Sequence, residues 1–221
     1  NIATILIPFL SFTFLYEIFN VATTGQISSY TLNFRPYWIL WFLLSMFLWK
    51  LLLPIILKFR FPLLISVSIA IVAGYVESVG LFLGVSRTLY FFPFFLVGHQ
   101  LSTTVLSNQF LLNIPKLVYF IILSLNLALF CWFREMPHQW LYGSYSYAGL
   151  EVGKLLGSVI RLSMYLISAI TCLAIIMLVP RTQSKISEFG ANSLYVYIWH
   201  GFIVKVLVGV GLIGLVGNLW A

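Results

Sequence analysis

The sequence predicts an all-α protein, a polytopic bundle of helices that cross a lipid bilayer. Of its 221 residues, 62% are hydrophobic and only 8% are charged, whereas about a quarter of a soluble domain is charged. A soluble domain of this size keeps a large wet exterior, because surface remains extensive relative to volume. Composition therefore excludes a soluble enzyme and a disordered chain, and lipid is the expected solvent for most of the surface.

Seven apolar stretches are long enough, or nearly so, to cross the hydrocarbon, which takes about 20 apolar residues. In lipid, only helices and closed barrels satisfy their own backbone. These stretches lack the alternation of apolar and polar residues that barrel strands show, so we expect helices. In chain order the stretches are residues 2–19, 37–57, 63–80, 90–106, 116–132, 155–179 and 193–219.

Polar segments separate these stretches and are expected to lie at the membrane surfaces. The first of them, residues 20–36, is rich in Thr, Ser, Gly and Gln, and residues 58–62 form a short basic turn. The longest, residues 133–154, is rich in Tyr, Trp, Gly and Ser, which is typical of a lid at headgroup level or a loop that faces substrate. No internal repeat or domain boundary is evident, so we expect one domain over residues 1–221.

The net charge of +7 predicts contact with anionic lipid headgroups. The basic residues are scattered and form no run, so we expect no binding of nucleic acid. The three histidines have no ligand spacing and no cysteine near them, so no metal site is predicted. The charge on either side of the stretches does not decide the orientation of the chain in the membrane.

Arg161 belongs to a polar stripe on the sixth stretch. At 100° per residue the stripe covers roughly 40° of the helix, so we expect it to face protein or a cavity. In such a place an arginine can hold a phosphate or carboxylate with two hydrogen bonds. The alternative is a snorkelling arginine among small packing residues. The stripe comprises Lys154, Ser158, Arg161, Tyr165, Ser168 and Cys172.

Three further polar or aromatic features have two interpretations each. Glu77 and Arg87 flank a short glycine-containing turn, so they form a structural ion pair or leave Arg87 to hold an anionic group. Trp41 belongs to an aromatic stripe on the second stretch, which walls a cavity or packs against neighbours. His200 follows Ser193 and Tyr197 on one helix face and is either a general base, for which no carboxylate stands at helical spacing to orient it, or a hydrogen-bonded residue of the bundle.

Four strings occur together in a fixed order along the chain. They are RPYWILWFL (35–43) continuing through LWK (48–50), SRTLYFFPFFLVG (86–98), WLYGSYSY (140–147) and GANSLYVYIWH (190–200). In this order and spacing the chain resembles the integral-membrane acyltransferase 3 family, and within it the fucose 4-O-acetylase-like sugar O-acetyltransferases. The resemblance extends from about Arg35 to His200.

The resemblance implies a fold of about ten helices that transfers acetyl from acetyl-CoA to a hydroxyl of a glycan or lipid-linked saccharide. The family's first helix carries an Arg/Asp-rich start and a catalytic histidine, and this chain contains no Asp. We therefore expect that the N-terminal helices and that histidine lie upstream of Asn1, with His200 as a weak candidate within the chain, or that the chain is not an active enzyme by itself.

The resemblance also implies roles for individual residues. Arg87 and Arg161 would steady the CoA phosphates or the reacting acyl group. Trp41, Tyr90 and Tyr145 would wall the cavity, and Ser144 together with Tyr145 would lie near the acceptor sugar. We expect a multi-pass protein of the plasma (inner) membrane, whose oligomeric state the sequence leaves open. The alternatives are a carrier or flippase for a lipid-linked sugar and an assembly subunit without chemistry of its own.

Overall fold

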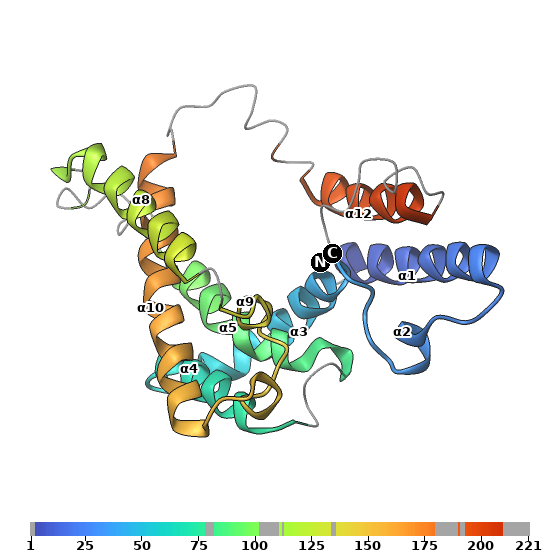
Figure 1. Cartoon of the computed structure of the whole chain (residues 1–221), viewed down its shortest axis with the longest axis horizontal. Helices are drawn as coiled ribbons and strands as arrows, with labels where there is room; N and C mark the ends of the chain where they lie inside the picture. Colours follow the sequence, from blue (N-terminus) through green and yellow to red (C-terminus); the bar gives the residue numbers. More distant parts are fainter. Residues whose placement is uncertain are drawn as a thin grey trace. The chain divides into compact units, whose positions relative to one another are not determined.

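The computed structural model describes residues 3–77, 82–101, 111, 113–133, 136–179, 190 and 193–209 (Figure 1). No β-strand occurs in these residues, and the predicted all-α class is confirmed. The α-helices are α1 (Ala3–Thr24), α2 (Ser29–Leu32), α3 (Trp41–Ile56), α4 (Pro62–Val72), α5 (Val85–Gln100), α8 (Lys116–Trp132), α9 (Gln139–Tyr142), α10 (Lys154–Leu178) and α12 (Ser193–Gly209). Short 3₁₀ turns are η1 (Ala73–Tyr75), η2 (Phe82–Gly84) and η3 (Ala148–Leu150).

Several predicted stretches begin or end differently from expectation: the first extends five residues further, to Thr24, and the fourth begins at Val85 instead of residue 90. The second helix starts at Trp41 instead of residue 37, because the backbone first makes a turn in which the amide of Leu40 donates to Tyr37. The third ends as an α-helix at Val72 and continues only as η1, since its last carbonyls are bonded from elsewhere in the fold, as described below. Residues 2, 78–80, 102–106 and 210–219 of the predicted stretches lie outside the described residues.

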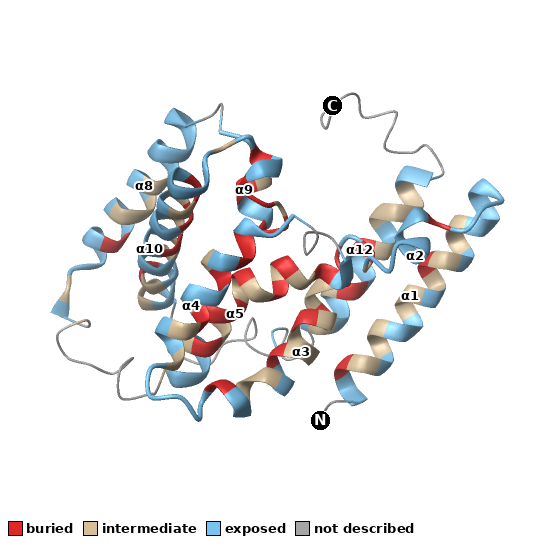
Figure 2. Ribbon diagram, turned by 90° about the horizontal axis from the view of Figure 1, so that it is seen from below, coloured by how far each residue is buried: buried red, intermediate tan, exposed pale blue. Residues whose placement is uncertain are grey.

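Two of the described helices, α1 and α10, are long and apolar enough to cross a membrane. The helices α3, α8 and α12 and the segment α4–η1 are equally apolar but shorter. Exposed residues cover much of α8 and α10 (Figure 2), and the exposed side chains include large apolar ones such as Leu155, Leu166 and Phe130. Seven crossings remain a prediction.

The first of two compact units comprises residues 1–47 and 182–221. In it α1 packs along α12, with the ring of Phe12 edge-on to Trp199 at a centroid distance of 5.3 Å. The hydroxyl of Tyr197 donates to the carbonyl of Ile39 at 2.6 Å and ties α12 to the turn before α3. Apolar packing and this partly buried hydrogen bond thus help to hold the unit together.

The second unit comprises residues 48–181. The helices α4 and α5 pack closely against each other, and α8 lies alongside α10. Aromatic rings fill the space between α4, α5 and α10, where Tyr90 stacks on Tyr165 with centroids 5.1 Å apart. The loop that contains α9 and η3 folds back over these helices, and it brings the polar residues of this unit together.

Candidate functional site

The strings 86–98 and 140–147 of the chain meet at the start of α5. The hydroxyl of Ser86 donates to the carbonyl of Gly143 at 2.8 Å. The next residue, Arg87, donates from Nε to Ser144 Oγ at 3.1 Å, and its guanidinium lies over the ring of Tyr142, 5.5 Å from the centroid. A half-buried guanidinium and a serine hydroxyl thus form the centre of the candidate site.

Backbone geometry at Gly143 places Ser144 opposite Arg87. Gly143 ends α9 in the left-handed region, with φ of +63°, where glycine is strongly preferred. A Cβ here would also lie 2.6 Å from the ring of Tyr90. The chain can therefore turn tightly over α5 only with glycine at this position, and the turn directs the following serine toward the helix.

Arg161 lies deeper in the same unit and is only 2% exposed. Its Nη1 donates to the carbonyl of Ala70 at 3.0 Å, and its Nη2 donates to the carbonyl of Tyr145 at 3.1 Å. The guanidinium lies over two rings, 4.8 Å from the centroid of Tyr147 and 5.2 Å from that of Tyr90. Carbonyl oxygens and ring faces thus replace the water that this cation would otherwise require.

These contacts cap the C-terminal end of α4. The last four carbonyls of an α-helix lack partners within the helix, and cations are favourable beside them. Arg161 bonds one of these carbonyls, that of Ala70, and the Tyr147 hydroxyl donates to the next, that of Ile71, at 3.0 Å. The amide of Tyr147 donates to Gly74 at 2.8 Å. Arg161 and Tyr147 together join α4, α10 and the loop that carries Ser144.

The hydroxyl of Tyr147 is a hydrogen-bond donor at this junction. Burial raises the pKa of its phenol, and the positive charge of Arg161 opposes that effect. A phenol is protonated at neutral pH with its ordinary pKa, and the increase leaves it so, which fits its role as the donor to the carbonyl of Ile71. Gly74 leaves the space that the ring occupies, because a Cβ there would lie 2.8 Å from Tyr147 Cε1.

The polar stripe on α10 faces inward only in its middle. Arg161 and Tyr165 are buried, while Ser158 and Ser168 are half-buried. Lys154 and Cys172 at its two ends are exposed. The expectation that Lys154 points inward was therefore wrong, because Lys154 is the first residue of α10 and no element of the described residues covers it.

The remaining candidate residues occupy different surroundings. Tyr90 and Tyr145 join the Arg161 cluster, the first through its ring and the second through its carbonyl. Trp41 belongs to the other compact unit and lies edge-on to Phe42 at 6.0 Å. His200, also in that unit, is exposed, and its Nδ1 lies 3.1 Å from the carbonyl of Val196 one turn earlier. Glu77 is exposed, and its pairing with Arg87 remains a prediction.

Glu17 is a polar centre of the first unit that sequence reasoning missed. Its carboxylate accepts hydrogen bonds from the amide of Ser28 and from the hydroxyls of Thr31 and Tyr37. These bonds fasten the loop after α1 to that helix. A carboxylate in an apolar stretch is the signal that could have identified it, since such residues usually have partners inside the protein.

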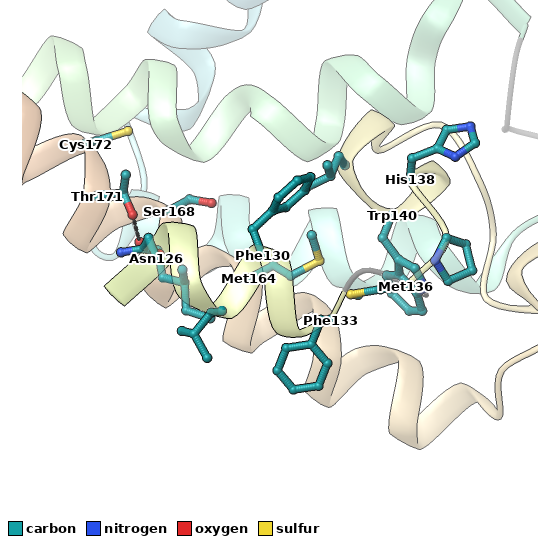
Figure 3. Close-up of a pocket in the computed structure, with 14 residues that line it drawn as sticks. Asn126, Phe130, Phe133, Met136, His138, Trp140, Met164, Ser168, Thr171 and Cys172 are labelled. Atoms are coloured by element: carbon teal, nitrogen blue, oxygen red, sulfur yellow. Dashed lines mark hydrogen bonds between the residues drawn. The ribbon is translucent and has the colours of Figure 1, made fainter. Parts of the chain in front are cut away.

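The second feature that sequence reasoning missed is an apolar cavity of about 530 Å³ between α8, α9 and α10. Figure 3 shows Phe130, Met164 and Trp140 along its length. The lining residues of α8 and α10 recur at spacings of three and four, so each helix contributes one face. That periodicity was visible in the sequence, but which faces oppose each other was not.

Among the described residues, no three His, Cys, Asp or Glu side chains lie close enough together to hold a metal ion. No protein-family model matches the chain, and no curated protein or solved structure matches it either.

Proposed function

We propose that this chain forms part of a multi-pass plasma-membrane O-acyltransferase that transfers acetyl from acetyl-CoA to a sugar hydroxyl. The acceptor is a glycan or a lipid-linked saccharide. One observation carries the proposal: two of the strings that resemble the acyltransferase 3 family, 57 residues apart at the contact, converge on one site through Arg87 and Ser144. Strings that mattered only for helix packing would have no need to converge on a polar site.

The chemistry of this site suits an anionic donor. Acetyl-CoA carries several phosphates, and attack on its thioester develops negative charge on the carbonyl oxygen. The planar guanidinium of Arg87 can bond such oxygens with two parallel N–H groups. Its bond to Ser144 and its position over Tyr142 hold it in one orientation, so little reorganisation is needed when the negative charge develops.

The test is the substitution Arg87→Ala in the whole protein, expressed in its own membrane. Removal of one preorganised charge that stabilises an oxyanion costs on the order of 10²–10³ in rate. We therefore expect acetylation of cell-surface glycan to fall by this factor while the amount of protein in the membrane is unchanged. Arg87→Lys should restore only part of the activity, because the ammonium lacks the planar fork.

Arg60→Ala is the matched control. Arg60 is also an arginine beside an aromatic ring, 5.3 Å from the centroid of Phe61, but it is exposed in the turn between α3 and α4. Acetylation should persist in this variant. Normal acetylation with Arg87→Ala would remove Arg87 from the reaction. Transport of a labelled lipid-linked sugar by the intact protein, without acetyl transfer, would favour the carrier alternative.

A further inference from the structure

The cavity between α8, α9 and α10 has the size and lining of a site for one small amphiphilic ligand. Ligand pockets in proteins enclose roughly 300–1,000 Å³ and are mainly apolar, and this one encloses about 530 Å³. Its face on α10 extends from Met164 to Cys172, about 12 Å at 1.5 Å per residue. The cavity is thus mainly apolar and about 12 Å long on this face, which suits a hydrocarbon chain.

The polar side chains at one end of the cavity are compatible with hydrocarbon. Figure 3 places Asn126, Ser168, Thr171 and Cys172 there. The amide nitrogen of Asn126 donates to Ile122 at 2.9 Å, and the Thr171 hydroxyl donates to Ile167 at 2.7 Å. Because these donors are bonded within their own helices, facing an alkyl chain leaves neither of them without a partner.

The other end of the cavity borders α9, the helix that precedes Ser144 in the chain. Trp140 and Leu141 line the cavity, and the next residue, Tyr142, lies under the guanidinium of Arg87. Ser144 is the third residue after Leu141, so their Cα atoms are at most about 11 Å apart. One short helix therefore borders an apolar cavity on one side and a cationic site on the other.

We propose that this cavity holds the hydrocarbon tail of a lipid-linked saccharide whose phosphate and sugar lie at Arg87 and Ser144. The apolar cavity would bind the hydrocarbon tail of such a molecule. The guanidinium of Arg87 would bind its phosphate. Flexible side chains, Met136 and Met164, let the cavity adapt to a chain of irregular conformation. The inference rests on the proposed function for the sugar, and it selects the lipid-linked acceptor over a free glycan.

The first experiment maps where an alkyl phosphate binds. The whole protein in phosphatidylcholine vesicles is irradiated with dodecyl phosphate that carries a diazirine in its tail, and the labelled peptides are identified by mass spectrometry. We expect labelling within residues 126–141 and 164–172. Unlabelled dodecyl phosphate at about ten times its Kd should reduce this labelling about tenfold, and inorganic phosphate should not.

Two substitutions test the two halves of the site. Ser168→Phe fills the cavity and should abolish the part of the labelling that unlabelled dodecyl phosphate reduces. Ser163→Phe is the matched control, because Ser163 is on the same helix but exposed and outside the cavity. Arg87→Gln should weaken binding of the phosphate probe about tenfold, the effect of losing a charge-assisted bond. Binding of an uncharged dodecanol probe should not change.

The inference is overturned if unlabelled dodecyl phosphate does not reduce the labelling of the cavity. It is also overturned if unlabelled dodecyl phosphate reduces labelling of the exposed face of α10 equally. Unchanged labelling in Ser168→Phe overturns it as well; where that variant does not accumulate, Ser168→Leu replaces it. Acetylation of a free glycan without competed labelling would refute this inference alone. Competed labelling in a protein that transfers no acetyl would refute the proposed function alone.

Discussion

Arg161 and Arg87 are the same residue type in the same compact unit, and both lie beside tyrosine rings, yet their surroundings differ. Arg161 is almost completely buried and donates to two backbone carbonyls from distant parts of the chain. Arg87 is half-buried at the start of α5 and donates to a serine hydroxyl. Arg161 is thus hydrogen-bonded to backbone carbonyls, whereas Arg87 is hydrogen-bonded to the side chain of Ser144 in the loop.

The difference shows how burial determines what an arginine can do. Removing a cation from water is costly unless its donors are satisfied, so both Nη groups of Arg161 are bonded to the protein, while its Nε has no hydrogen-bond partner among the described residues. A half-buried guanidinium keeps part of its hydration and can exchange it for a substrate oxygen. Arg161 therefore supports the fold, whereas Arg87 acts on substrate only under the proposed function, and four substitutions test this distinction.

Arg161→Met should have the largest effect on stability. It leaves the carbonyls of Ala70 and Tyr145 buried without their donor, and each unsatisfied polar group costs about 1–3 kcal/mol. We expect the free energy of unfolding to fall by about 2–5 kcal/mol, measured by denaturation in lipid discs. Arg87→Met should lower it by less than about 1 kcal/mol. Equal losses would erase the distinction between the two arginines.

Gly74→Ala should come next. Its Cβ would lie against Arg161 Nη1 and the ring of Tyr147, and overpacking of this kind costs about 1–3 kcal/mol. Gly98→Ala is the control, because nothing lies within 4 Å of a Cβ at that position on α5. The same denaturation measurement should show the control unchanged or slightly more stable. If Gly74→Ala does not lower the stability, the side chains of Arg161 and Tyr147 move away from the added methyl group at little cost in free energy.

Tyr147→Phe should have a smaller effect. It keeps the ring over Arg161 but removes the hydroxyl that bonds Ile71 at the end of α4. The expected loss is about 1 kcal/mol, the usual net value of one hydrogen bond. Tyr75→Phe removes an exposed hydroxyl, which contacts Ser158 at 2.7 Å, and should change the denaturation midpoint less. A larger loss of stability in Tyr75→Phe than in Tyr147→Phe would show that the carbonyls at the end of α4 do not need the Tyr147 hydroxyl as a donor.

Ser144→Ala should change stability least, by about 0.5 kcal/mol or less, since water can replace the hydroxyl beside a half-buried guanidinium. Under the proposed function, acetylation should nevertheless fall, because Arg87 loses the partner that orients it. Denaturation midpoints and glycan acetyl content measured on the same preparations check both parts. A large loss of stability would place Ser144 with the supporting residues around Arg161.

The inward position of Arg161 was predictable because helical periodicity puts it in the middle of a polar stripe. Its partners were not, since Ala70 is 91 residues away along the chain and Tyr145 lies in a loop. The same holds for the site, where Arg87 and Ser144 were separate candidates and their contact across 57 residues followed only from the fold. The cavity was missed because opposing helix faces cannot be paired from one sequence.

The amino-acid sequence by itself determined the all-α class of this protein: its apolar runs lack the alternation of strands and favour helices in lipid, and periodicity orients each helix about its own axis. Only the tertiary structure decided where α4 ends, which carbonyls Arg161 bonds and that α9 borders both a cationic site and an apolar cavity. The physical reason is that hydrophobic periodicity is a property of neighbouring residues. Hydrogen bonds from a buried cation depend instead on which distant segments approach it.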